Sequence, residues 1–141
     1  LRTSYRRYFE RKEGVYHGFN TLAFGLLYRA LPHHRFFQGR RFQNALDYLE
    51  HPDYLGGLEN SEYAFSYNPP GFEVPATWAL TRQERSPKAV VTWLNRQFQW
   101  GLRPDEWDLG RGTSDPVIAT ARIYELVHLP DSWFQLEIQL P

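Results

Sequence analysis

The sequence predicts a mainly α fold of helical hairpins with one small β-hairpin. Three observations support this prediction: apolar residues recur at helical spacing in several segments, Pro or Gly follows most of those segments, and one central stretch alternates and then reverses. With 141 residues, the chain is long enough for one domain with a hydrophobic core and short for two. We therefore expect residues 1–141 to form a single domain.

Two helical segments are predicted before residue 32. A short first helix, capped by Thr3 or Ser4, ends at Gly14. The second helix runs from His17 to Leu31, and Pro32 ends it. Its apolar residues form one continuous stripe at helical spacing, which we expect to face the core: Phe19, Leu22, Ala23, Leu26, Leu27, Ala30 and Leu31.

A further helix is predicted from Arg40 to His51, where Pro52 ends it. Apolar residues recur on one of its faces and polar residues occupy the other. Because only a short connector separates this helix from the preceding one, the two are predicted to pack as an antiparallel helical hairpin.

The stretch from Asp53 to Leu80 is predicted to form the β-hairpin. It opens with a Gly-Gly turn, continues with aromatic residues at alternate positions from 63 to 67, and reverses at Asn68-Pro69-Pro70-Gly71. Extended backbone is expected to resume at residues 72–74, and a short helix to follow from Pro75 to Glu84. The alternating aromatic residues also fit one buried face of a hairpin.

Two cap-and-proline signals begin helices in the second half of the chain. Ser86-Pro87 opens a helix through Trp100, and Ser114-Asp115-Pro116 opens another to His128. The second of these is apolar almost all round, so we expect it to be the most buried helix. Between them, residues 102–113 carry Pro, Gly and acidic residues typical of a loop. Apolar residues alternate from Phe134 to Leu140 and predict a strand.

Composition excludes several classes of partner and site. Sixteen basic and sixteen acidic side chains cancel, so no net charge draws the protein to nucleic acid or to an anionic membrane surface. No apolar run approaches the length of a membrane span. The absence of cysteine excludes disulfides, thiolate nucleophiles and cysteine metal sites. We therefore predict neither a nucleic-acid partner nor a membrane partner.

The histidines and glycines do not predict a metal or a cofactor. His33 and His34 are adjacent, and neither has a histidine partner at i+3 or i+4 on a helix. The glycine-containing loop at residues 110–112 lacks the lysine of a phosphate-binding loop. His17 fits either a surface residue before its helix or a group for acid–base chemistry.

Polar and aromatic side chains gather on the predicted hairpin. Carboxylates, amides and phenols among aromatic rings are typical of a surface that binds sugars or other small polar metabolites. We predict that five residues contact such a ligand: Tyr63, Tyr67, Asn68, Phe72 and Trp78. Glycoside chemistry uses two carboxyl groups across a pocket, and Glu62 and Glu59 lie beside these aromatic residues in the sequence.

The pattern as a whole resembles the helical-toroid, or (α/α) barrel, carbohydrate enzymes, which include N-acylglucosamine 2-epimerase relatives and six-hairpin glycosidases. The stretches that carry the likeness are Tyr16 to Asn20, Asp53 to Gly57, Asn60 to Glu73, and Asp115-Pro116. The resemblance implies that histidines and glutamates on inner loops transfer protons or cleave glycosidic bonds. It also implies a larger barrel, because a complete toroid needs about a dozen helices. The missing part would be the remainder of the same barrel or a second copy in a homo-oligomer.

Two classes of function remain open. The first is a carbohydrate-active enzyme of the epimerase, hydrolase or lyase type. In that enzyme Glu62 or Glu59 acts as acid or base, and the resemblance points to His17 as the partner. The second is a non-catalytic helical interaction domain whose aromatic residues form a protein interface. A concave pocket with converging acids favours the enzyme, and a flat apolar patch favours the interaction domain.

Overall fold

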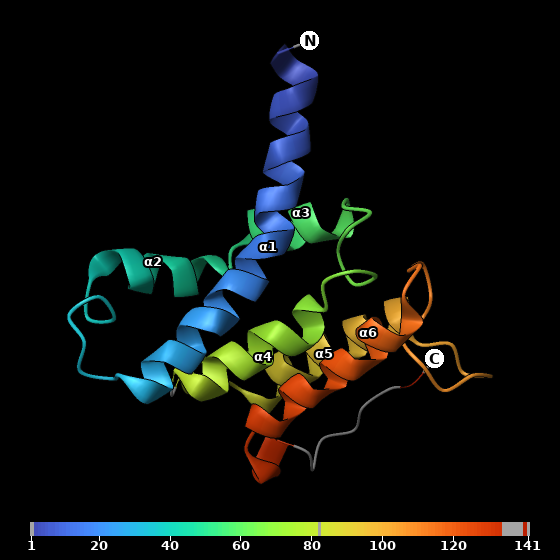
Figure 1. Cartoon of the computed structure of the whole chain (residues 1–141). Coiled ribbons are helices and arrows are strands. Elements are labelled where there is room, and N and C mark those ends of the chain that lie inside the picture. The colour runs from blue at the N-terminus through green and yellow to red at the C-terminus, as the bar shows by residue number, and fades with distance from the viewer. Residues whose placement is uncertain (1, 82, 134–139, 141) are drawn as a thin grey trace.

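The structure, a computed structural model, describes residues 2–81, 83–133 and 140, with side chains from residue 12 onward. These residues are mainly helical, as the sequence predicts. The elements in chain order are α1 (Arg2–Ala30), α2 (Arg40–Tyr48), α3 (Pro52–Glu59), α4 (Pro70–Leu80), α5 (Pro87–Gly101), α6 (Pro116–Ala121) and the 3₁₀ helices η1 (Arg122–His128) and η2 (Asp131–Trp133) (Figure 1). Except for Leu140, the predicted tail strand falls outside the described residues.

Helix α4 lies at the centre of the fold. Figure 1 shows α1 and the α6–η1 run on either side of it, with α5 behind, and all three elements contact it. Ten of the eleven residues of α4 are buried. Among the described helices this arrangement closes no barrel. The main core contains residues from α1 to α5 and from the loops after them, with its largest fully buried side chains at Trp78, Tyr54 and Phe72.

Helix α1 is a single helix, whereas two were predicted. Gly14 does not end it, because this glycine keeps helical backbone and only Gly112 among the described glycines has positive φ. The face that packs against α4 consists largely of small residues. A Cβ atom added at Gly25 would lie 3.2 Å from the Cβ of Leu80, so the two backbones approach closely. The predicted stripe is only partly buried for this reason: Leu22 is buried, but Leu26 is 43% and Leu27 50% exposed.

The prediction of a β-hairpin is wrong. Residues 52–59 and 70–80 are helices, and the turns between them hold an isolated bridge from Ala64 to Asn68 instead of a strand pair. Pro70 begins α4 at a position where a helix needs no N–H donor, so the Pro-Pro-Gly sequence starts a helix instead of reversing a hairpin. The side chain of Gln97 fixes this arrangement: its amide accepts from the N–H of Gly71 at 3.3 Å and donates to the carbonyl of Phe65 at 2.8 Å.

Both cap-and-proline predictions are confirmed. Ser86 Oγ accepts from the N–H of Ala89 at 3.3 Å, and Asp115 Oδ1 accepts from the N–H of Ile118 at 3.0 Å. Helix α5 therefore begins at the predicted position. Helix α2 also begins as predicted, at Arg40, and ends three residues before His51, the residue that caps α3.

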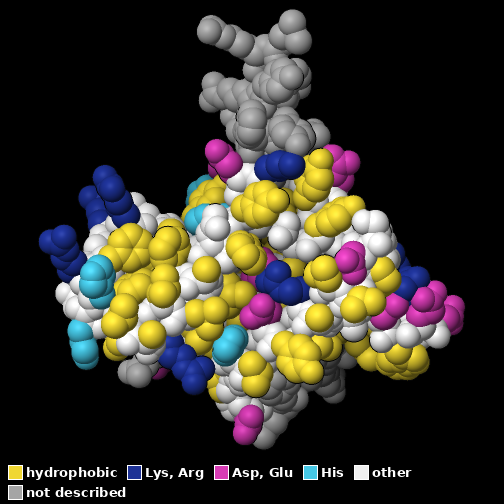
Figure 2. All heavy atoms as spheres, in the orientation of Figure 1, with side chains coloured by type: hydrophobic (Ala, Val, Ile, Leu, Met, Phe, Trp, Pro, Cys, Tyr) yellow, Lys and Arg dark blue, Asp and Glu magenta, His cyan; other side chains and the backbone are white. Residues whose placement is uncertain are grey.

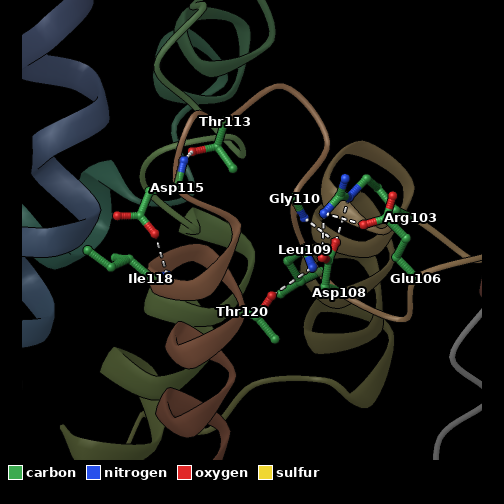
Figure 3. Close-up of polar contacts among 9 residues, drawn as sticks. All are labelled: Arg103, Glu106, Asp108, Leu109, Gly110, Thr113, Asp115, Ile118 and Thr120. Atoms are coloured by element: carbon green, nitrogen blue, oxygen red, sulfur yellow. Dashed lines mark hydrogen bonds and ion pairs between the residues drawn. The ribbon is translucent and has the colours of Figure 1, made fainter.

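The loop between α5 and α6 is fixed by polar contacts (Figure 3). Arg103 Nε donates to Asp108 Oδ1 at 2.7 Å, and the same oxygen accepts from the N–H of Gly110 at 2.9 Å. The N–H of Leu109 then donates to Thr120 Oγ1 at 2.9 Å, which joins the loop to α6. The loop is thus ordered by its own side chains, and the contact with Thr120 holds it against α6.

The α6–η1 run was predicted to be the most buried helix, and this prediction is wrong. Neither α6 nor η1 contains a buried residue, and the helix changes from α to 3₁₀ at Arg122. Val117, Tyr124 and Val127 are each more than 70% exposed. The run packs against α4 on one side only, so most of its apolar surface has no described neighbour.

Candidate functional site

The most unusual polar group in the described structure is Glu73, in the first turn of α4. Its side chain is 0% exposed, and its Oε1 lies 2.8 Å from Nη2 of Arg122 on η1. Burial raises the pKa of Glu73 from 4.5 to about 7, although the charge and hydrogen bond of Arg122 oppose the shift. A carboxyl group with such a pKa exchanges protons near neutral pH, which makes it a candidate for acid–base chemistry.

The second oxygen of Glu73 faces α1 at Gly18. A Cβ atom added at Gly18 would lie 2.8 Å from Glu73 Oε2 and 2.9 Å from the hydroxyl oxygen of Tyr54. Within the described residues, Glu73 Oε2 has no hydrogen-bond partner, and the Tyr54 hydroxyl faces the backbone of Gly18. Burial, followed by the nearby charge of Glu73, raises the pKa of Tyr54 well above its usual range. The glycine thus leaves space where a carboxyl and a phenol meet the backbone of α1.

His17 lies next to this pair. Its Nε2 is 2.7 Å from the carbonyl oxygen of Ala45 and must carry a proton to donate to it. Its ring makes edge contacts with Tyr48 and Tyr54, with centroid distances of 5.1 and 5.6 Å. Burial lowers the pKa of His17 below 6.5, so the neutral form is favoured. The predicted histidine is therefore placed one aromatic ring away from Glu73.

The two predicted acids lie elsewhere, at the surface. Glu59 is at the end of α3 and pairs with Arg96 at 3.3 Å, and Glu62 is an exposed residue of the following turn. His17 makes its described contacts with α2 and α3 residues other than these two glutamates. The roles of Glu59 and Glu62 remain predictions. From the sequence, Glu73 was placed on the same hairpin as Glu59 and Glu62 but was given no catalytic role.

The predicted ligand-binding residues are spread over two environments. Tyr67 is 51% exposed, and its ring centroid lies 6.3 Å from that of Tyr63, which is half-buried like Asn68. Phe72 is fully buried against Phe98 in the core. The fifth residue, Trp78, is also buried, and it lines a separate cavity of about 430 Å³. Ligand contact by these five residues remains a prediction.

The described side chains give no support for a metal centre or a membrane span. No group of three or more histidines and carboxylates among them is arranged to hold a metal ion. None of the described helices is both long enough and apolar enough to cross a bilayer.

Comparison with known proteins found one similar protein. No protein-family model matches the sequence, and no solved structure matches it. The chain is 35% identical over 128 residues to Archaeal glycosylation protein Q of Haloferax volcanii. The match covers 91% of this chain and 34% of that protein, so the chain spans about a third of the length of its curated relative.

Proposed function

We propose that this chain handles a carbohydrate in a glycosylation process. The observation that carries the proposal is the 35% identity to Archaeal glycosylation protein Q, which extends over 91% of the chain. Such a match over nearly the whole chain includes the helices that surround Glu73. The composition of the site agrees with a polar substrate, because a carboxyl, a phenol, an imidazole and a guanidinium gather around one helix.

Within that role, we propose acid–base chemistry of the epimerase, hydrolase or lyase type. Glu73 is the acid whose surroundings favour it most, since its pKa of about 7 suits proton transfer in both directions. Arg122, which pairs with Glu73 Oε1 at 2.8 Å, is 21% exposed and is therefore the member of the pair that solvent reaches. The sequence-predicted acids, Glu59 and Glu62, are the competing assignment.

We further propose that the fold belongs to a larger helical toroid. Two faces of the described structure are apolar and exposed: the outer side of α1, with Leu26 and Leu27, and the α6–η1 run. Figure 2 shows hydrophobic side chains over much of this side of the molecule, with acidic and basic side chains near its middle. Further helices of a barrel, or a second copy of the chain, would cover these faces.

The uncovered faces also support the alternative, a helical interaction domain. Phe24, Leu31 and Phe36 are exposed and line an apolar cavity of about 280 Å³ beside the end of α1. An exposed apolar surface of this kind is typical of a protein interface. In that case the buried pair of Glu73 and Arg122 has a structural role only.

The test is turnover of glycosides and amino sugars by the intact protein, with Glu73→Gln, Glu59→Gln and Glu62→Gln variants. The proposal predicts a loss of about 100-fold or more for Glu73→Gln, with turnover by the surface variants within about 3-fold of the parent. Thermal melts exclude unfolding as the cause. If turnover is lost in Glu62→Gln instead, Glu62 is the catalytic acid or base. A parent protein that neither binds nor turns over any sugar would favour the interaction domain.

A further inference from the structure

A cavity of about 430 Å³ lies at the end of α4, apart from the contacts of Glu73. It is lined by Trp78 and Ala79 of α4, by residues 83–85 of the following segment, and by Pro130 and Trp133 at η2. The volume lies within the range of small-molecule sites. Two indole rings from segments far apart in the sequence therefore share one hollow, together with an amide, a carboxylate and a guanidinium.

Trp78 has an unsatisfied donor at this place. The residue is 1% exposed, and its Nε1 has no hydrogen-bond partner in the described structure. A buried N–H without an acceptor is unfavourable, because it loses its hydrogen bond to water. The guanidinium of Arg85 lies 5.2 Å from the centroid of the Trp78 ring, so the ring already has a cation over one face. The Trp78 side chain therefore forms part of the cavity wall, with the Arg85 guanidinium beside it.

The charges of the lining residues that the structure describes favour a neutral ligand. Arg85 already has three protein neighbours: Nη1 donates to the carbonyl of Glu84 at 3.0 Å, Nη2 donates to Gln83 Oε1, and Nε lies 2.9 Å from Glu50 Oε1 in an ion pair without a hydrogen bond. The Glu84 side chain adds an acidic group to the described lining. An anionic sugar would therefore meet an occupied cation and a second negative charge.

We propose that this cavity binds one neutral sugar residue, with its C–H face against the ring of Trp133 and its hydroxyl groups toward Gln83 and Glu84. Aromatic faces carry negative charge density and attract the weakly positive C–H groups of a sugar ring. Amides and carboxylates accept hydroxyl hydrogens. The inference rests on the proposed carbohydrate function and names the substrate class and the place where it binds.

The experiment uses ¹⁹F NMR of the intact protein labelled with 5-fluorotryptophan. Trp→Phe variants assign the five tryptophan signals. Neutral hexoses, N-acetylhexosamines and hexuronic acids are then titrated in turn. We expect a neutral sugar to shift the signals of Trp78 and Trp133 and to leave that of Trp107 in place, because Trp107 is 73% exposed on the loop after α5. Trp107 thus serves as an internal control.

Variants separate this inference from the proposed chemistry. Trp133→Ala and Gln83→Ala should each weaken binding by about 3- to 10-fold, and Trp107→Ala should leave it unchanged. Glu73→Gln should retain binding even if turnover is lost. Three results would overturn the cavity site: shifts confined to other tryptophans, unchanged affinity in both cavity variants, or a preference for the hexuronic acid. The proposed chemistry is judged separately, by the turnover test. Absence of any shift in the parent would also overturn it.

Discussion

Helix α4 and the α6–η1 run are both rich in apolar residues, yet their burial is opposite. In α4, ten of eleven residues are buried, including the carboxyl group of Glu73. In the α6–η1 run no residue is buried, and Tyr124 is 79% exposed. The difference lies in the neighbours: α4 has α1, α5 and η1 around it, whereas the main helix contact of the run among the described residues is with α4.

An apolar sequence alone therefore does not bury a helix, because other elements of the fold must pack around it. The pattern of residues 115–128 is that of an interior helix, and a larger assembly would bury it. The same reasoning applies to the outer stripe of α1, where Leu26 and Leu27 stay about half exposed. Stability in this chain should therefore depend strongly on α4 and weakly on the run.

The largest effect on stability is expected from removing a buried aromatic ring of α4. Phe72→Ala in α4 should lower the free energy of unfolding by about 3 to 5 kcal/mol, because it leaves a cavity next to Phe98 in the core. Tyr124→Ala on η1 removes an equally large ring and should change it by about 0.5 kcal/mol or less. Urea denaturation measures both. A large loss for Tyr124→Ala would show that its face is covered in solution, by a second copy or by another part of the protein.

The sequence predicted the parts of the fold that depend on local chemistry. Helix starts at Pro87 and Pro116 follow from capping residues and proline, which act within one turn. The site could not be found in the same way. Glu73 meets Arg122 across forty-nine positions, and Gly18 matters only because α1 approaches α4 closely. The sequence did contain one indication of the site: Glu73 stands in the apolar segment from Phe72 to Leu80. If that segment is assigned as a helix, the glutamate is predicted to lie in the core.

The second prediction concerns the charge buried in α4. The folded-state pKa of Glu73 is about 7 and its usual value is 4.5, so the folded protein holds a proton that the unfolded chain has lost between these values. Stability should therefore fall as pH rises from about 4.5 to 7, by about 3 kcal/mol in total. Glu73→Gln should remove this slope.

Two controls keep this pH test specific. His17 has a lowered pKa, so its contribution to stability has the opposite sign and is lost as pH falls through 6.5. It is present in both proteins and cancels in the difference between parent and Glu73→Gln. Glu59→Gln, which alters an exposed pair, should keep the slope of the parent. Parallel pH profiles for the parent and Glu73→Gln would mean that Glu73 is ionised in the folded protein throughout this range.

The third prediction compares two glycines on one helix. Gly18→Ala should destabilise the protein by about 1 to 3 kcal/mol, because the new methyl group would lie 2.8 Å from Glu73 Oε2 and 2.9 Å from the Tyr54 oxygen. Gly14→Ala has no atom within 4 Å of the new methyl group and should stabilise α1 by about 0.5 to 1 kcal/mol. Thermal melts distinguish the two. Equal effects would mean that α1 does not approach α4 as closely as the structure shows.

The smallest effect on stability is expected for a substitution of Trp107, on the exposed loop after α5. Trp107 has φ of 53°, a left-handed conformation that costs an L-residue about 1 to 2 kcal/mol. It is 73% exposed, so its ring contributes little burial. Trp107→Gly should relieve the strain at an entropic cost of about 0.5 to 1 kcal/mol, for a net change between zero and a stabilisation of about 1 kcal/mol.

Phe65 provides the matched test, because it has the same backbone conformation, with φ of 61°, in a buried setting. It is 4% exposed, and its ring is stacked on Trp100 at a centroid distance of 6.1 Å. Phe65→Gly should therefore destabilise the protein by about 3 kcal/mol or more, since lost burial outweighs the relief of strain. If both variants were destabilised equally in urea, the ring of Trp107 would have to be buried in solution. The partner that covers it would then lie next to the uncovered α6–η1 run, to which Leu109 and Thr120 join this loop.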